Sequence, residues 1–233
     1  MISRLKAHFR PLVNNAIPRR EWVRARLSEL PDDALLLDAG CGEQQYREYC
    51  GRLQYRGQDF GKFEVDEAKG LAASDTKWNY GELDYVGNIW DIDEKDATFD
   101  AILCTEVLEH VPEAGDTILE FGRLLKSGGK LFLTVPSNSL RHQDPYYFVA
   151  GYSDHYLRYW LEKAGFSEIE IEPQGDYHQW LMCEDLRSMR SGSLLAKVAL
   201  FPAFLYRYWK QRTPTAESIA TLCLGYHVTA VRS

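Results

Sequence analysis

The sequence of 233 residues lacks the patterns that mark several classes of protein. Its five cysteines, at positions 41, 50, 104, 183 and 223, form no Cys-x-x-Cys pair, so no metal site is predicted. No apolar run approaches about 18 residues, and the first residues lack the apolar core of a signal peptide, so we expect a cytoplasmic protein with reduced thiols. Internal repeats and low-complexity tracts are also missing.

Positive charge is in deficit, with 27 Lys and Arg against 34 Asp and Glu and a formal net charge of −7 at pH 7. Binding to a nucleic-acid backbone depends on clustered Lys and Arg, so we expect no nucleic-acid partner. The first 26 residues are locally basic, but such a run is typical of a solvated helix face.

Short apolar runs alternate with helical patterns along the chain. Helices are predicted over residues 19–30, 44–52, 114–126 (ended by Gly128 and Gly129) and 154–164 (begun by Ser153). Strands are predicted over residues 34–39, 54–59, 83–90, 99–104, 130–135, 168–172 and 226–231. This alternation predicts an α/β fold, a sheet with helices on both faces.

We expect one domain over residues 1–233, since the hydrophobic content of 45% is enough for one large core. It divides into an N-terminal helical segment (1–30), a cofactor-binding core (31–172 and 226–233) and a long insertion (173–225). The insertion holds an apolar helical stripe within residues 194–209, interrupted at Pro202. A lid or a packed helix is favoured for this stripe over contact with a membrane surface, and a homodimer contact stays open.

The segment Leu35–Gly42, Leu-Leu-Leu-Asp-Ala-Gly-Cys-Gly, is the most informative part of the chain. Its apolar run predicts a buried parallel strand. Gly40 and Gly42 follow the strand and allow the backbone to turn tightly and approach a ligand, because no Cβ intervenes. Open α/β sheets bind their ligands at this end of the strands, so a nucleotide-type cofactor is predicted there.

Charge discriminates between two kinds of cofactor for this loop. Dinucleotide binding favours a third small residue at the position of Gln45, and the carboxylates of Asp38 and Glu43 would repel a pyrophosphate. S-adenosylmethionine carries an ammonium and a sulfonium, so it fits the acidic loop better than a nicotinamide or flavin cofactor. An ordinary strand-to-helix turn without a ligand is the alternative.

Six segments together carry a resemblance to a protein family. They are Leu36–Gly42, Gly57–Asp59, Gly87–Ile89, Phe99–Cys104, Glu106–Val111 and Leu124–Gly129. In this order and spacing the chain resembles class I S-adenosylmethionine-dependent methyltransferases of the subgroup with a Leu-Glu-His-Val signature. The resemblance implies a Rossmann-like, doubly wound, mostly parallel seven-stranded sheet with an antiparallel last strand and a helical insertion before it.

The resemblance also implies which residues contact the cofactor. At the methionine end they are Asp38, Gly40, Cys41, Gly42, Thr105 and Glu106. At the ribose and adenine they are Asp59 (both ribose hydroxyls), Phe60 (an adenine face), and Asn88 and Ile89 (the adenine edge). The chain departs from the family pattern where Gln44 replaces a third glycine and where Asn88 replaces a common aspartate.

Methyl transfer from a sulfonium is an in-line displacement, so alignment supplies much of the acceleration, and an oxygen nucleophile also needs a base. His110 is a candidate base, because imidazole titrates near neutral pH. The alternative is a structural role, in which His110 and Glu109 pack at the end of the fourth strand. His142 and Asp144, in the loop after the fifth strand, are the other candidate bases.

These observations predict methyl transfer to a small-molecule acceptor, with O-methylation of a sugar or secondary metabolite as the first hypothesis. A quinone or lipid-precursor methyltransferase is an alternative, and so is a regulatory protein that binds S-adenosylmethionine without turnover. We expect residues 141–156 and 173–225 to select the acceptor, since the sheet ends are occupied by cofactor contacts.

Overall fold

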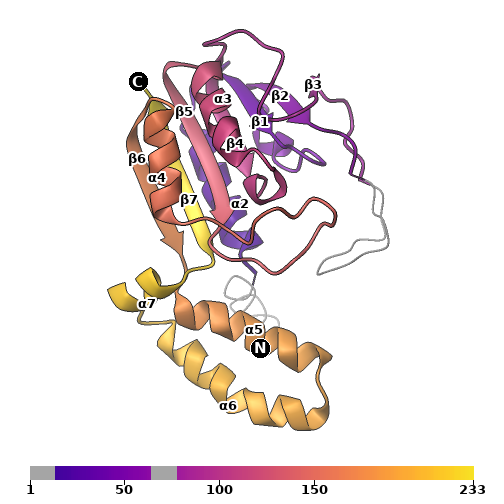
Figure 1. Ribbon diagram of the computed structural model, residues 1–233, viewed down its shortest axis with the longest axis vertical. Coiled ribbons are helices and arrows are strands. Elements are labelled where there is room, and N and C mark those ends of the chain that lie inside the picture. Colours follow the sequence, from indigo (N-terminus) through magenta and orange to yellow (C-terminus); the bar gives the residue numbers. More distant parts are fainter. Residues whose placement is uncertain (1–13, 64–77) are drawn as a thin grey trace.

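The computed structural model describes residues 14–63 and 78–233, which form a central seven-stranded sheet (Figure 1). Its strands are β1 (Leu35–Ala39), β2 (Gln54–Asp59), β3 (Tyr85–Val86), β4 (Phe99–Thr105), β5 (Leu125–Pro136), β6 (Phe166–Gln174) and β7 (Gly225–Arg232). Their order is β3-β2-β1-β4-β5-β7-β6, with β1 to β5 parallel and β7 antiparallel to both of its neighbours. The predicted fold class is confirmed.

Helices cover both faces of the sheet because successive strand residues point to opposite sides. Leu36 of β1 packs in one cluster with Val23 and Leu27 of α2 (Ala16–Ser28). Leu37, the next residue along, belongs to the cluster on the other face, where α3 (Ala114–Leu124) and α4 (Asp154–Lys163) lie (Figure 1). α2 accounts for most of the predicted helix 19–30; residues 1–13 of the predicted segment 1–30 lie outside the described residues.

The helix predicted over residues 44–52 is wrong. This segment forms turns and a single short 3-10 helix, η1 (Arg47–Tyr49). Gln44 has a backbone φ of +56°, which no helix residue adopts, so the chain leaves the glycine loop by a turn instead of entering a helix.

Two other predicted boundaries differ from the structure. The strand predicted over 83–90 is reduced to β3, because the chain turns away after Val86. Helix α3 ends at Leu124, so the glycines at 128 and 129 do not cap it and lie inside β5. There the pairing of β4 with β5 shifts register, and Gly128 takes a φ of +79°. The helix predicted after Ser153 is confirmed as α4, and the Ser153 side chain accepts a hydrogen bond from the Tyr156 N–H.

The predicted insertion between β6 and β7 contains α5 (Tyr177–Ser191), α6 (Leu194–Lys210) and α7 (Ala216–Thr221). α5 and α6 lie side by side as a hairpin that extends away from the sheet at the edge where β5 ends (Figure 1). The apolar stripe of α6 therefore does not pack on the sheet, and α6 has no buried residue. Within the described residues, no helix has both the length and the apolar character needed to cross a bilayer.

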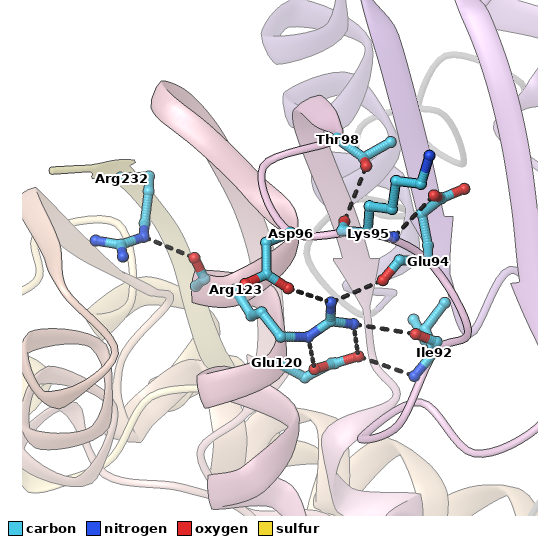
Figure 2. A network of polar contacts seen from close by, with 9 residues as sticks. Ile92, Glu94, Lys95, Asp96, Thr98, Glu120, Arg123 and Arg232 are labelled. Carbon is cyan, nitrogen blue, oxygen red and sulfur yellow. Dashed lines mark hydrogen bonds and ion pairs between the residues drawn. The ribbon is translucent and has the colours of Figure 1, made fainter.

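An arginine on α3 fastens the segment that connects β3 to β4 (Figure 2). The Arg123 guanidinium donates two hydrogen bonds to the Glu120 carboxylate, at 2.8 and 2.7 Å, and one to Asp96 at 2.7 Å. It also donates to the carbonyls of Glu94 and Ile92, at 2.7 and 3.0 Å. Glu120 in turn accepts from the Ile92 N–H at 2.8 Å. Arg123 and Glu120, which form an ion pair on α3, thus both bond to the segment between β3 and β4.

Replacing Arg123 with methionine is expected to lower the free energy of unfolding by about 2–3 kcal/mol, because the nearly buried Glu120 loses its charged partner. Urea denaturation followed by circular dichroism measures this change. Lys126→Met is the control: its ion pair with Asp100 is more exposed and is expected to contribute about 0–1 kcal/mol. Equal losses in both variants would contradict a special role for the Arg123 network.

Candidate active site

The glycine loop after β1 is held in a conformation that only small residues adopt easily. Gly40 and Gly42 have φ values of +70° and +52°, and a Cβ at Gly40 would lie 2.5 Å from Val107 Cγ1. The Gly40 N–H donates to the Gln58 carbonyl at 2.8 Å, and the Gly42 N–H donates to Asp59 Oδ2 at 2.9 Å. The loop after β1 is therefore bonded to the end of β2, which fixes one wall of a cavity.

This cavity has a volume of about 500 Å³ and lies at the carboxyl ends of β1, β2 and β4. Every residue that the sequence assigned to the cofactor lines it: Asp38, Gly40, Cys41, Gly42, Asp59, Phe60, Asn88, Ile89, Thr105 and Glu106. His110 lines it as well, together with aromatic side chains from the loops, among them Trp78 and Tyr146. The Tyr146 ring packs edge-on against Phe60, 4.9 Å between centroids.

Carboxylates give the cavity a negative character that suits a cationic ligand. Asp38 is 2% exposed and accepts a 2.8 Å hydrogen bond from the Tyr55 hydroxyl. Burial raises the pKa of Asp38 to about 7, the Tyr55 hydrogen bond opposes the rise, and the nearby Asp59 adds to it. Burial also raises the pKa of Asp59. Two buried carboxylates that favour a nearby positive charge fit the ammonium and sulfonium of S-adenosylmethionine.

The glutamine in place of the family's third glycine has a structural explanation. Gln44 takes the left-handed φ of +56° that a glycine would allow, and its side chain secures it. Its amide nitrogen donates to the carbonyls of Tyr80 and Glu82, at 2.7 and 2.8 Å, and its amide oxygen accepts from Arg47 at 2.7 Å. Gln44 thus points away from the cavity and joins the glycine loop to the segment before β3.

Glu106, directly after β4, stands between this cavity and a second one. Its backbone φ is +53°, uncommon for a residue with a side chain, and its N–H donates to the Thr134 carbonyl at 2.9 Å. Its carboxylate accepts from the Thr134 hydroxyl at 3.0 Å and pairs with Arg19 of α2 at 2.9 Å. Arg19 was not predicted as a site residue, because nothing in the local sequence indicates that α2 reaches the end of β4.

The second cavity has a volume of about 460 Å³ and adjoins the first. Four residues line both cavities: Arg19, Glu106, His110 and Gln143. Its other walls include the loop after β5, with Ser139 and His142, and four residues of α5: Trp180, Cys183, Glu184 and Arg187. Parts of both segments that were expected to select the acceptor therefore meet in this cavity.

Glu109, His110 and His142 converge at the border of the two cavities, each offering one ligand atom within 4.8 Å of the others. His110 Nδ1 lies 2.6 Å from the Tyr146 carbonyl and His142 Nδ1 lies 2.8 Å from the Leu140 carbonyl. Carbonyls only accept hydrogen bonds, so each Nδ1 carries a proton and each Nε2 keeps a free electron pair in the neutral ring.

The buried carboxylate of Glu109 completes this group. Its Oε1 lies 3.7 Å from His110 Nε2, and its buried Oε2 has no hydrogen-bond partner among the residues described. Burial raises the pKa of Glu109, with Glu106 adding to the rise, and burial lowers the pKa of His110 to about 4. One carboxyl group and two imidazoles oriented by backbone carbonyls form a donor set that divalent cations bind. No metal site was predicted from the cysteine spacing, and the sequence contains no signal for this group because His142 lies 32 positions beyond His110.

Asp144, the third candidate base, does not lie with His110 and His142. It lines neither cavity, and its carboxylate pairs with Arg141 at 2.9 Å. His110 and His142, by contrast, are in ring contact, 4.7 Å between centroids.

The strand order, the antiparallel seventh strand and the acidic cavity at the ends of β1, β2 and β4 are those of class I S-adenosylmethionine-dependent methyltransferases. Residues 16–171 match the family described as a methyltransferase domain, and the chain belongs to that family. Its cofactor is S-adenosylmethionine.

Known proteins similar to this chain agree with that assignment. A ubiquinone biosynthesis O-methyltransferase of Xanthomonas axonopodis pv. citri (strain 306) is 29% identical over 214 residues, which cover 90% of this chain and 81% of the relative. Phosphoethanolamine N-methyltransferase 2 of Haemonchus contortus, solved with S-adenosyl-L-methionine, superposes with a TM-score of 0.56 at 17% identity; the match covers 92% of this chain and 52% of that one. This chain thus spans about half the length of that enzyme.

A methyltransferase of Archaeoglobus fulgidus, described as dependent on the same cofactor, superposes with a TM-score of 0.52 at 18% identity, covering 91% of this chain and 94% of that one. At such identities the two structural matches establish the fold.

Proposed function

We propose that this protein transfers a methyl group from S-adenosylmethionine to a hydroxyl group on an aromatic ring, in a precursor of a quinone. The observation that carries the proposal is the second cavity, which shares a border of four residues with the cofactor cavity and has Trp180 in its wall. A ring in this cavity presents its hydroxyl toward the methyl donor, as in-line transfer requires. The quinone assignment, preferred here to a sugar or another secondary metabolite, is supported by similarity to ubiquinone biosynthesis O-methyltransferases.

Within this proposal, the cofactor residues keep the roles that the family pattern implies. Asp38 and the glycine loop hold the methionine end, Asp59 holds the ribose, and Asn88 meets the adenine edge. S-adenosylmethionine, when bound, supplies an electrophilic methyl group. Glu106 is paired with Arg19, which holds its carboxylate beside Thr105 at the methionine end.

We assign Glu109, His110 and His142 to a divalent cation that binds the acceptor oxygen. A pKa near 4 makes His110 a weak base, whereas a neutral imidazole with a free Nε2 is a good metal ligand. These three residues would hold the cation, whose positive charge would favour loss of a ring-hydroxyl proton to solvent and would stabilise the ionised oxygen. Two adjacent ring hydroxyls bind such a cation better than one, so a catechol is the preferred acceptor.

The test is methyl transfer from isotopically labelled S-adenosylmethionine to simple acceptors. A catechol such as 3,4-dihydroxybenzoate should be methylated faster than the corresponding monophenol, and faster than a nucleotide sugar. Turnover of sugars alone would refute the quinone assignment. Cofactor binding without S-adenosylhomocysteine formation from any acceptor would favour the alternative of a regulatory protein that binds the cofactor without turnover.

A cytoplasmic location is part of the proposal. It is supported by the five free cysteines, four of which are buried as thiols, as expected in a reducing compartment.

Affinity for S-adenosylhomocysteine is expected to rise with pH through neutrality. Burial raises the pKa of Asp38 to about 7, so below that pH its carboxyl must lose a proton before it can pair with the ligand's ammonium group. Calorimetry should show Kd falling tenfold or more between about pH 5.5 and about pH 7.5. Asp38→Asn should remove this dependence. Tyr55→Phe, which removes a hydrogen bond that lowers the pKa of Asp38, should move the rise to higher pH. A wild-type Kd independent of pH would contradict the proposed contact.

A further inference from the structure

Helix α6 exposes large apolar side chains on the side that faces water. Its outward side chains are large and apolar, with between 46% and 78% of their surface exposed: Leu194, Leu195, Val198, Phe201, Leu205, Tyr206 and Trp209. They recur at the spacing of a single helical face, called here the outer face of α6. Monomers in water rarely expose a contiguous apolar surface of this kind.

The side of α6 that meets α5 makes a charged contact through Arg207. The Arg207 guanidinium pairs with the buried carboxylate of Asp185 and donates to the Leu181 carbonyl at 3.3 Å. Leu200 and Phe204 of α6 are half-buried, whereas the apolar side chains of the outer face are left for another surface.

The charge of the hairpin identifies that surface. Residues 177–212 contain six basic residues and two acidic ones, although the whole chain has a net charge of −7. Both acidic residues are paired within the hairpin: Glu184 with Arg187 at 3.1 Å, and Asp185 with Arg207. The other four basic residues are Arg190, Lys197, Lys210 and Arg212. α6 itself contains no acidic residue.

We propose that the outer face of α6 lies on an anionic lipid surface. Apolar side chains on one face with lysines beside them are the features by which helices bind in the plane of a membrane interface. The lysine stems extend along the apolar face while their ammonium groups reach the headgroups. At 17 residues and about 1.5 Å per residue, α6 is about 25 Å long and lies along the surface rather than across it.

The position of the hairpin links the lipid contact to the second cavity. α5, which packs against the inner side of α6, also forms a wall of the second cavity. Docking therefore brings the acceptor cavity to the lipid surface, where an acceptor with a long apolar tail is found. This second step rests on the proposed function, whereas the docking itself does not.

Sedimentation with vesicles tests the docking directly. The full chain should bind vesicles of phosphatidylcholine and phosphatidylglycerol in equal amounts, bind vesicles of phosphatidylcholine alone at least tenfold less, and be released by salt. The double variant Phe201→Glu/Leu205→Glu should lose binding at least tenfold. Its matched control, Val86→Glu/Tyr159→Glu, changes two apolar side chains elsewhere that are at least as exposed, and it should bind as wild type does.

Calorimetry with S-adenosylhomocysteine verifies that each variant is folded, since no residue of the hairpin lines the cofactor cavity. Failure of the wild-type chain to bind anionic vesicles would overturn the proposal, and so would equal binding by the Phe201→Glu/Leu205→Glu variant. Light scattering could instead show that the wild-type chain is a dimer, that the Phe201→Glu/Leu205→Glu variant is a monomer, and that neither binds vesicles. That result would assign the outer face of α6 to a second copy of the chain and would also overturn the proposal. Because these measurements need no turnover, they remain decisive if no acceptor is methylated.

Discussion

Replacing Asp59 with alanine is expected to weaken the binding of S-adenosylhomocysteine about a hundredfold, the largest effect of any single change in the cofactor cavity. The proposed contacts to the ribose hydroxyls are lost. Two hydrogen bonds that hold the backbone are lost as well. Asp59 Oδ2 accepts the Gly42 N–H of the glycine loop at 2.9 Å, and Oδ1 accepts the Gly61 N–H at 3.0 Å. Together these losses amount to about 3 kcal/mol, which isothermal titration calorimetry measures as the change in Kd.

Two variants separate the ribose contact of Asp59 from its hydrogen bonds to the backbone. Asp59→Asn keeps one acceptor oxygen and should fall between wild type and alanine. Asp84→Ala removes a carboxylate that also accepts a backbone N–H of β2, from Gly57 at 2.9 Å, but that does not line the cavity. It should change Kd less than about threefold. An equal loss in the Asp59 and Asp84 alanine variants would reduce the role of Asp59 to holding the backbone.

Removal of the cation site is expected to abolish turnover while leaving cofactor binding intact. His142→Ala should lower kcat a hundredfold or more and remove bound divalent metal, since a ligand is lost whose orientation the Leu140 carbonyl fixes. A chelator should inhibit the wild-type enzyme, and Mg²⁺, Mn²⁺ or Zn²⁺ should restore it. Metal content is measured by mass spectrometry, and Kd for S-adenosylhomocysteine should stay unchanged because His142 does not line the cofactor cavity.

His155→Ala is the matched control, because this histidine is exposed on α4 and lines neither cavity. Glu109→Gln offers a second variant that preserves shape and removes the carboxyl group. Full activity of wild-type enzyme in a chelator, with kcat lost on mutation of His110, would instead make that histidine the base, one of the two roles that the sequence left open.

The cofactor cavity could be predicted from the sequence because its residues follow the ends of strands. Asp38 ends an apolar run and Asp59 ends the next strand, and carboxyl ends of parallel strands meet at one edge of a sheet. The ten residues themselves were implied by the resemblance to the methyltransferase family, whose motifs lie at these strand ends. The boundaries of β4 and α4 were predictable from the sequence, since each has a strong apolar pattern and α4 has a capping serine.

The features that were missed depend on contacts between distant segments. The ion pair of Arg19 with Glu106 joins α2 to the end of β4. The convergence of His142 on Glu109 depends on how the loop after β5 folds back, with the Phe148 N–H donating to the Glu109 carbonyl at 3.0 Å. The helix predicted over 44–52 failed because the bonds of Gln44 to residues 80 and 82, far along the chain, outweigh local helix preference.

The pairing of β6 with β7 makes the helical hairpin exchangeable. Gln174 and Gly225 are direct neighbours across the two antiparallel strands, and the Leu224 N–H donates to the Gln174 carbonyl at 2.7 Å. The insertion that contains α5, α6 and α7 thus leaves and re-enters the sheet at a single point, where a tight turn could join the strands. Recombination or protein engineering can therefore replace the whole segment without altering sheet register or cofactor cavity, giving one catalytic scaffold a new destination and a new acceptor in a single step.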